Sequence, residues 1–385
     1  MSKDKVSRRN YVKYAGAGVV VVAVAAAGGY YATRPGQPTT TTTTTGMEKR
    51  GPVRFLTWED YGSDWIVKKC MEETGIEVQP TFMSDNDEGF AKAMAAPDAY
   101  DCYCFDNPYT NRLKKAGITQ PLDESRIHID RLFDDFQYPF YNYIDGQTWG
   151  ITNFWGPQAM GYNTSKVPDE YVESWDIMYE DPWHGEANPY KGYISQMSSP
   201  LEVISTTALY LGLGGPSLDR EVDPFVLNDD QMEEVKQSLI RQKPLLRTYW
   251  EGTADLVKSF AEGEVQIANV YSLQVAKLVE AGIPVKFWTP KEGATYWVDT
   301  YTVNKKLLDT DATYDFINWI TGPEIQAEMS ADTYGASTCK EAGNYMSQEL
   351  KEITGYDIGP AKFIVWKEVE NYSDWISLFD EVMAA

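Results

Sequence analysis

"KEGATYWVDTYTV", residues 291–303, begins as a turn and continues through β-branched and aromatic residues, a composition typical of a strand. Trp297 and Asp299 lie two residues apart, so on a strand their side chains point to the same face. A carboxylate beside an indole is an unusual occupant of a core strand, because a buried charge needs a partner. The pair therefore raises the question of whether this strand faces a cleft instead of a core.

The chain from residue 52 onward alternates predicted strands and helices. Strands are predicted at 53–58, 76–83 and 100–105, and helices at 63–75, around 88–96 and at 109–117. The pattern begins again near residue 154, with strands at 192–197 and 265–271 and a helix at 200–212. This order predicts an α/β fold with mainly parallel sheets and helices on both faces.

Aromatic and acidic residues fall at the ends of these predicted strands. Trp58 ends the first strand, Asp106 follows the third, and Tyr271 ends a later one. Ligands of open α/β sheets bind at the carboxyl ends of strands. Together with Trp297 and Asp299, these residues predict a single acidic and aromatic site.

Composition excludes some classes of partner. The net charge is −23; the first fifty residues hold eight Lys and Arg against two Asp and Glu, a net +6, so the remainder carries −29. This balance argues against nucleic acid as a partner and fits either a cationic ligand or a solvated acidic surface. The aromatic share of 14% includes 26 Tyr and 12 Trp, which are favoured where apolar surface must also be wet.

Cysteine and histidine predict no metal site, cofactor or catalytic residue. The four cysteines are Cys70, Cys102, Cys104 and Cys339, and their spacing matches no zinc or redox motif. Buried free thiols are the commoner case for such an apolar run as 100–105, although an exported location also permits a disulfide. Only two histidines are present, and we find no zinc-protease, nucleophile-elbow or P-loop motif.

Residues 1–33 are predicted to be a twin-arginine-type signal or an N-terminal membrane anchor. "SRRNYVK", residues 7–13, precedes an uncharged run over residues 14–32, as in twin-arginine export signals; the alternative is a basic flank on an ordinary membrane helix. The run is just long enough to span a bilayer, whereas Ala25-Ala26-Ala27 also fits a cleavage site. Residues 34–50 form a Thr- and Pro-rich linker, which is useful to a tethered domain, so we expect an exported protein anchored by its N-terminal segment.

Several longer segments carry a family resemblance by their order and spacing. They are "TWEDY", "EETGIEV", "YDCYCFDNPYTNRLKKAGITQPLD", "FWGPQAMGYNTSKV", "SWDIMY", "PLEVISTTALYLG", "SFAEGEVQIANVYS", "PKEGATYWVDTYTV", "FINWITGPEIQAE" and "YGAST". From about Val53 to the C-terminus, the chain resembles the extracellular solute-binding proteins of ABC importers, specifically the spermidine/putrescine-binding branch.

The resemblance implies a two-lobed periplasmic-binding-protein fold with a ligand cleft between the lobes. Lobe 1 would comprise residues 51–153 and 298–343, and lobe 2 residues 154–297 and 344–385, with crossings near residues 153, 297–299 and 343. The implied function is capture of a polyamine and its delivery to an ABC permease and its ATPase subunits. We expect a monomer without enzymatic activity.

The resemblance also implies a set of ligand-binding residues. A polyamine needs aromatic walls for its methylenes and carboxylates for its ammonium groups. The family's positions fall on Trp58, Tyr61, Glu202, Tyr271, Trp297 and Asp299 of this chain, and Asp106 joins them as a gained carboxylate where the family has a small hydroxyl. Two further departures are Ser199, where the family commonly has aspartate, and Ala336, where it has tyrosine.

Each of these residues has a structural alternative. "SPLE", residues 199–202, fits a capping box that would engage Glu202 with the helix backbone. Trp58 and Trp297 could pack the lobes, and Asp106 could be a turn residue. An exported hydrolase with two carboxylates and a binding protein of the same fold for a sugar, an amino-acid-like solute or iron are the alternative functions. Iron would favour a cluster of tyrosines over these tryptophans, whereas sugars are excluded less firmly.

Overall fold

The computed structural model describes residues 49–360 and 363–385, which belong to one unit, Met47–Ala385. The twin-arginine motif, the uncharged run and all but the last two residues of the predicted linker lie outside the described residues. Among the helices of the described part, none is long and apolar enough to cross a membrane.

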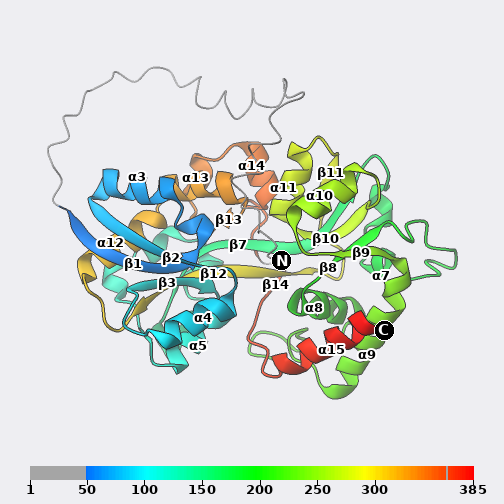
Figure 1. Ribbon diagram of the computed structural model, residues 1–385, viewed down its shortest axis with the longest axis horizontal. Coiled ribbons are helices and arrows are strands. Elements are labelled where there is room, and N and C mark those ends of the chain that lie inside the picture. The colour runs from blue at the N-terminus through cyan, green and yellow to red at the C-terminus, as the bar shows by residue number, and fades with distance from the viewer. Residues whose placement is uncertain (1–48, 361–362) are drawn as a thin grey trace, which may run out of the picture. The chain divides into compact units, whose positions relative to one another are not determined.

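The first half of the fold is built on three parallel strands. β1 (Arg50–Trp58) pairs in parallel with β2 (Ile76–Met83) and with β3 (Cys102–Asp106). Three helices flank them: α3 (Asp64–Thr74), α4 (Asn86–Ala95) and α5 (Pro108–Lys115). Figure 1 shows α3 above these strands and α4 and α5 below them. α3 begins after Ser63 and ends at Gly75, which adopts the left-handed φ of 74° that glycine tolerates, so the predicted helix limits are confirmed.

The second half repeats the plan. β8 (Ile194–Met197) pairs in parallel with β9 (Leu246–Trp250) and with β10 (Ile267–Tyr271). The helices around them are α7 (Asp176–Tyr179), α8 (Pro200–Leu211), α9 (Asp229–Gln242), α10 (Thr253–Ala261), α11 (Ser272–Glu280) and α15 (Tyr372–Ala384). In Figure 1, α10 and α11 lie above this part of the sheet and α8, α9 and α15 lie below it.

Two long strands join the halves into one sheet of order β2-β1-β3-β12-β7-β10-β8-β9. β7 (Ile151–Asn163) is buried along its whole length and runs antiparallel to β12 (Ala294–Asn304) and to β10. β12 in turn runs antiparallel to β3 through Asp299–Val303. The blocks are thus parallel, as predicted, but the joining strands are antiparallel, because each carries the chain back across the sheet.

Shorter elements complete the fold. β11 (Val285–Trp288) and β13 (Ala336–Ser337) pair with β7, whereas β4 (Thr119–Gln120) and β14 (Phe363–Val365) pair with β12. β5 (Tyr143–Ile144) and β6 (Gln147–Thr148) form a separate hairpin. The remaining helices are α6 (Asp134–Gln137), α12 (Thr310–Ile320), α13 (Pro323–Thr333) and α14 (Gln348–Thr354).

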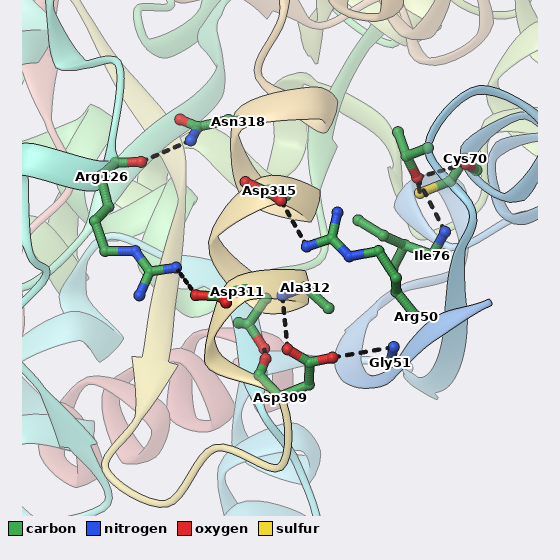
Figure 2. A network of polar contacts seen from close by, with 12 residues as sticks. Arg50, Gly51, Cys70, Ile76, Arg126, Asp309, Asp311, Ala312, Asp315 and Asn318 are labelled. Atoms are coloured by element: carbon green, nitrogen blue, oxygen red, sulfur yellow. Dashed lines mark hydrogen bonds and ion pairs between the residues drawn. The ribbon is translucent and has the colours of Figure 1, made fainter. Parts of the chain in front are cut away.

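A polar network anchors the start of β1 to α12, as Figure 2 shows. Asp309 caps α12 by accepting a hydrogen bond from the Ala312 amide, and its other oxygen accepts one from the Gly51 amide. The Arg50 guanidinium pairs with Asp315 on the same helix at 2.6 Å. The contacts made by Gly51 and Arg50 join residues more than 250 positions apart in sequence, so they tie the start of β1 to a distant helix.

Two large hydrophobic cores lie in the two halves of the sheet. The indole of Trp297 packs against both of them. Asp299 is buried with only 4% of its surface exposed. All four cysteines are buried, and their thiols are free.

Candidate functional site

A cavity of about 1000 Å³ is lined by all seven residues that the sequence singled out. They come from β1 and the turn after it, β3, β12, α8 and β10: Trp58, Tyr61, Asp106, Glu202, Tyr271, Trp297 and Asp299. Trp58, Asp106 and Tyr271 are the last residues of their strands. The structure thus brings these three strand ends together on the wall of one cavity.

Asp299 and Asp106 form the acidic centre of this cavity. They are register partners on the antiparallel strands β12 and β3, and both side chains line the cavity. Tyr61 donates its hydroxyl proton to Asp299 at 2.5 Å, and the Trp58 indole N–H donates to the other oxygen at 3.2 Å. The Asn86 amide donates to Asp106 at 2.6 Å. Within the described residues, the side-chain hydrogen bonds to the pair thus come from neutral donors.

Burial disfavours the charged form of both acids, and the charge of a nearby carboxylate, Glu202 for Asp106 and Asp106 for Asp299, adds to this effect. Burial raises the pKa of Asp106 to about 6, against hydrogen bonds from its neighbours that oppose the shift. Burial and the charge of Asp106 hold the pKa of Asp299 well above its ordinary value. The hydroxyl of Tyr61 has a raised pKa for the same two reasons, burial and the Asp299 charge, so it stays a proton donor.

The basic residues on the cavity wall are engaged elsewhere. Among the described residues, Arg112 and Lys367 are the lysines and arginines that line it, against eight aspartates and glutamates. Arg112 pairs with Asp87 at 3.2 Å and lies over the Tyr109 ring. Lys367 pairs with Asp219 and Asp223. The wall is therefore strongly acidic, and its central pair is not neutralised by either cation.

Glu202 brings a third inner carboxylate from α8. Tyr271 donates to one of its oxygens at 2.8 Å, and the Ser199 hydroxyl donates to the other. Ser199 stands at the N-cap of α8 but makes no side-chain hydrogen bond to the helix backbone. The capping-box alternative is thus wrong, because Ser199 directs its hydroxyl to the glutamate; two hydroxyls orient the carboxylate in the cavity wall.

Aromatic side chains supply the rest of the wall. Trp58 and Trp297 are half-buried, line the cavity and also pack against the cores. Gly156 on β7 is the register partner of Trp297, and a Cβ there would lie 2.7 Å from the indole ring. The absent side chain leaves the room that the indole occupies.

The turn alternative for Asp106 is also wrong. This residue belongs to β3, and its side chain lines the cavity. Ala336 is buried in β13 opposite Trp155 and is not part of the cavity wall, which includes Tyr334 instead. A tyrosine ring is thus present in the wall two residues before position 336. The hydroxyl of this Tyr334 donates a hydrogen bond to Glu280.

Several segments of the wall were missed by sequence reasoning, and two of them follow strands. Ser84–Asp87 line the cavity directly after β2, and the strand-end rule applied to this strand as well would have found them. The second segment runs from Trp366 to Ile376, beyond β14. Its acidic and aromatic "WKEVENY" resembles the other wall segments in composition, which is a weak signal. Within the described residues, no group of three or more potential ligands could hold a metal ion.

Comparisons with known proteins agree with this architecture. Over 285 residues, the chain is 27% identical to the putrescine-binding periplasmic protein SpuD of Pseudomonas aeruginosa, covering 71% of this chain and 74% of the relative. It is 26% identical over 315 residues to the putrescine-binding periplasmic protein PotF of Escherichia coli, covering 79% and 82%.

A solved structure shows the same fold. The spermidine/putrescine ABC transporter substrate-binding protein PotD of Streptococcus pneumoniae matches with a TM-score of 0.72 and 21% identity, covering 87% of this chain and 99% of that one. The family model for bacterial extracellular solute-binding proteins matches residues 65–352. Since this match spans well over half of the chain, the protein belongs to the bacterial extracellular solute-binding proteins of ABC transporters, and it is a binding protein and not an enzyme.

Proposed function

We propose that this protein captures a polyamine of the putrescine or spermidine type and delivers it to an ABC permease with its ATPase subunits. The observation that carries the proposal is the arrangement of three inner carboxylates, Asp106, Asp299 and Glu202, on the wall of one aromatic cavity. An ammonium group buried beside them would offset the repulsion that raises the pKa of Asp106 and Asp299. The names of the relatives are consistent with this ligand class.

The carboxylates are arranged for a ligand with separated charges. Asp106 and Asp299 come from the first block of the sheet and its joining strand, whereas Glu202 comes from a helix of the second block. The Glu202 charge contributes to raising the pKa of Asp106, so the two acidic positions act on each other within one cavity. A diamine or triamine could place one ammonium at each position, with its methylenes against Trp58 and Trp297.

We also propose where the protein is located and how its two lobes move. Residues 1–33 would direct export and then anchor the protein at the outer face of the membrane, with 34–50 as a tether. The lobes would be residues 51–153 with 298–343, and 154–297 with 344–385, closing as a monomer around the ligand. Trp297, which packs against both cores, would then report closure through its fluorescence.

Calorimetry on the exported protein tests the ligand class. Putrescine and spermidine should bind, whereas a panel of neutral sugars, zwitterionic amino acids and ferric citrate should give no heat of binding. Saturable binding of a sugar, an amino acid or iron, with no binding of either amine, would assign the same fold to another solute and overturn the polyamine proposal.

A further inference from the structure

Asp106 and Asp299 lie directly opposite each other on β3 and β12, and both line the cavity. Side chains in such positions are close neighbours, so two ionised carboxylates there repel each other unless one of them takes up a proton. The remaining contacts to the pair come from Trp58, Tyr61 and Asn86, which are neutral donors. With both acids ionised, two like charges would lie side by side in a buried place, which is the arrangement in which carboxylate pairs retain a proton.

The other titratable groups around the pair do not supply a compensating charge. They reach it from β3, from the turn after β1, from α5, α8, β10 and β12, and they are Cys104, Tyr61, Tyr109, Glu202, Tyr271 and Tyr301. Burial raises the pKa of Cys104 and of all four tyrosines, so these groups stay neutral, and Glu202 adds a further acid. The two cations on the wall, Arg112 and Lys367, pair with other carboxylates.

This inference rests on the proposed function and concerns how the same site works. We propose that Asp106 and Asp299 hold one proton between them in the empty site, and that an ammonium group bearing N–H bonds takes the place of that proton. The carboxyl O–H bond breaks, the proton passes to solvent, and two ammonium N–H groups donate to the two carboxylates. Binding of an amine therefore releases a proton. Asp106 causes this release, because it is the second carboxylate that makes the pair retain a proton in the empty site.

The replacement also determines specificity. One ammonium must donate to both carboxylates, which needs at least two N–H bonds on the same nitrogen. Primary and secondary ammonium groups have them, whereas a quaternary ammonium has none, even though the aromatic wall would accept its methyl groups. With serine at position 106, a single carboxylate remains, and the demand for two donors is removed.

Calorimetry with putrescine in buffers of different ionisation enthalpy measures the number of protons released. At pH 5.5 the wild-type protein should release close to one proton per ligand, and its affinity should rise by up to about tenfold per pH unit between pH 5 and 6. Asp106→Ser and the isosteric Asp106→Asn should release almost none, and their affinity should be flat over this range. Glu202→Gln is the matched control, because it removes a cavity carboxylate and leaves the pair intact: it should bind more weakly and still show both proton release and a pH-dependent affinity.

A second arm compares putrescine with its fully N-methylated analogue. The wild-type protein should discriminate between them by at least about a hundredfold, and Asp106→Ser should narrow that ratio at least tenfold. Amine binding by the wild type without proton release, or an unchanged pH profile in both Asp106 variants, would overturn this inference while the polyamine assignment stands. Absence of any amine binding by the wild type would overturn both.

Discussion

Gly156 and Trp297 face each other on neighbouring strands, and the indole ring fills the space where a side chain at position 156 would stand. The nearest ring atom lies 2.7 Å from the position of that absent Cβ. Trp297 is also the residue that packs against both cores while lining the cavity. A glycine on one strand thus sets the position of an aromatic wall on the next.

Replacing Gly156 with alanine should move the indole and weaken amine binding. Overpacking of this kind costs about 1–3 kcal/mol of stability, and the displaced indole should also lose cation–π contact with the ligand. Thermal unfolding and calorimetry would measure the two effects. Gly252→Ala is the control, because its added Cβ would meet nothing nearer than 3.6 Å; equal amine affinity in both variants would contradict the assigned role of the indole.

Asp299→Asn keeps the shape of the side chain and removes its charge. Breaking a buried, hydrogen-bonded charge pair costs roughly 2–5 kcal/mol, so polyamine binding should weaken by that amount at pH 8, where the pair is ionised with ligand bound. The fold should remain intact, because the side chain faces the cavity. Calorimetry beside circular dichroism would check both statements, and unchanged affinity would show that another carboxylate holds the ammonium.

Trp297→Ala should cost at least about 1–2 kcal/mol of binding through lost apolar and cation–π contact. Trp319→Ala is the matched control, since this indole hydrogen-bonds to Glu73 and lies outside the cavity wall. Calorimetry with putrescine on both variants separates a ligand contact from general loss of a tryptophan. Equal losses in the two variants would contradict direct contact by Trp297.

Local sequence signals predicted the parallel blocks well and the joining strands poorly. α3 begins after Ser63 and ends before Gly75, as predicted, and β2 has the limits predicted from its residues. β7 carries Gly156, Pro157 and Gly161 inside a fully buried strand, and these residues normally argue against a central strand. Its pairing with β12 and β10 depends on partners more than a hundred residues away, so no local pattern could reveal it.

Residues of the cavity wall could be predicted from the sequence where a predicted strand ends at the cavity. Asp106 and Asp299 were each singled out, but their pairing is a matter of register between β3 and β12, which sequence periodicity does not fix. The segment from Trp366 to Ile376 lines the cavity after β14. No strand was predicted before this segment, so the strand-end rule could not find it.

Tyr271→Phe should weaken binding by removing the hydroxyl that orients Glu202. A hydrogen bond of this kind is worth about 0.5–1.5 kcal/mol, so the loss of affinity for putrescine should be roughly two- to tenfold. Tyr210→Phe removes a similar hydroxyl–carboxylate bond, to Glu180, from the same helix as Glu202 but outside the cavity. Calorimetry should show an effect of the first substitution alone, and an equal effect of both would point to general loosening of α8.

The N-terminal segment should direct export through its arginine pair. With Arg8→Lys and Arg9→Lys together, precursor should accumulate in the cytoplasm, because the twin-arginine route reads both guanidinium groups. Cell fractionation would measure this, and normal translocation of the double variant would remove the twin-arginine interpretation.

Retention of residues 14–32 should make the protein sediment with membranes and resist a carbonate wash, since this uncharged run is long enough to span the bilayer. N-terminal sequencing of the exported protein provides the independent check. A mature chain that begins at Gly28 would show cleavage at the alanine run and would contradict anchoring.

The ligand-free protein should lose stability as the pH rises, because folding raises the pKa of its acid pair. Burial raises the pKa of Asp106 to about 6 from an ordinary value of 3.8, so between these values the folded state binds more protons than the unfolded state. The free energy of unfolding then falls as pH rises through this window, by on the order of 1–3 kcal/mol between pH 4 and 7. Asp106→Asn cannot ionise and also removes the charge that helps to raise the pKa of Asp299, so its urea unfolding curves should show a smaller decline of stability with pH. Saturating putrescine should abolish the difference in slope, because the bound ammonium balances the ionised pair. Parallel pH profiles of the two ligand-free proteins would contradict the raised pKa of the pair and, with it, the physical reason for the proposed cationic ligand.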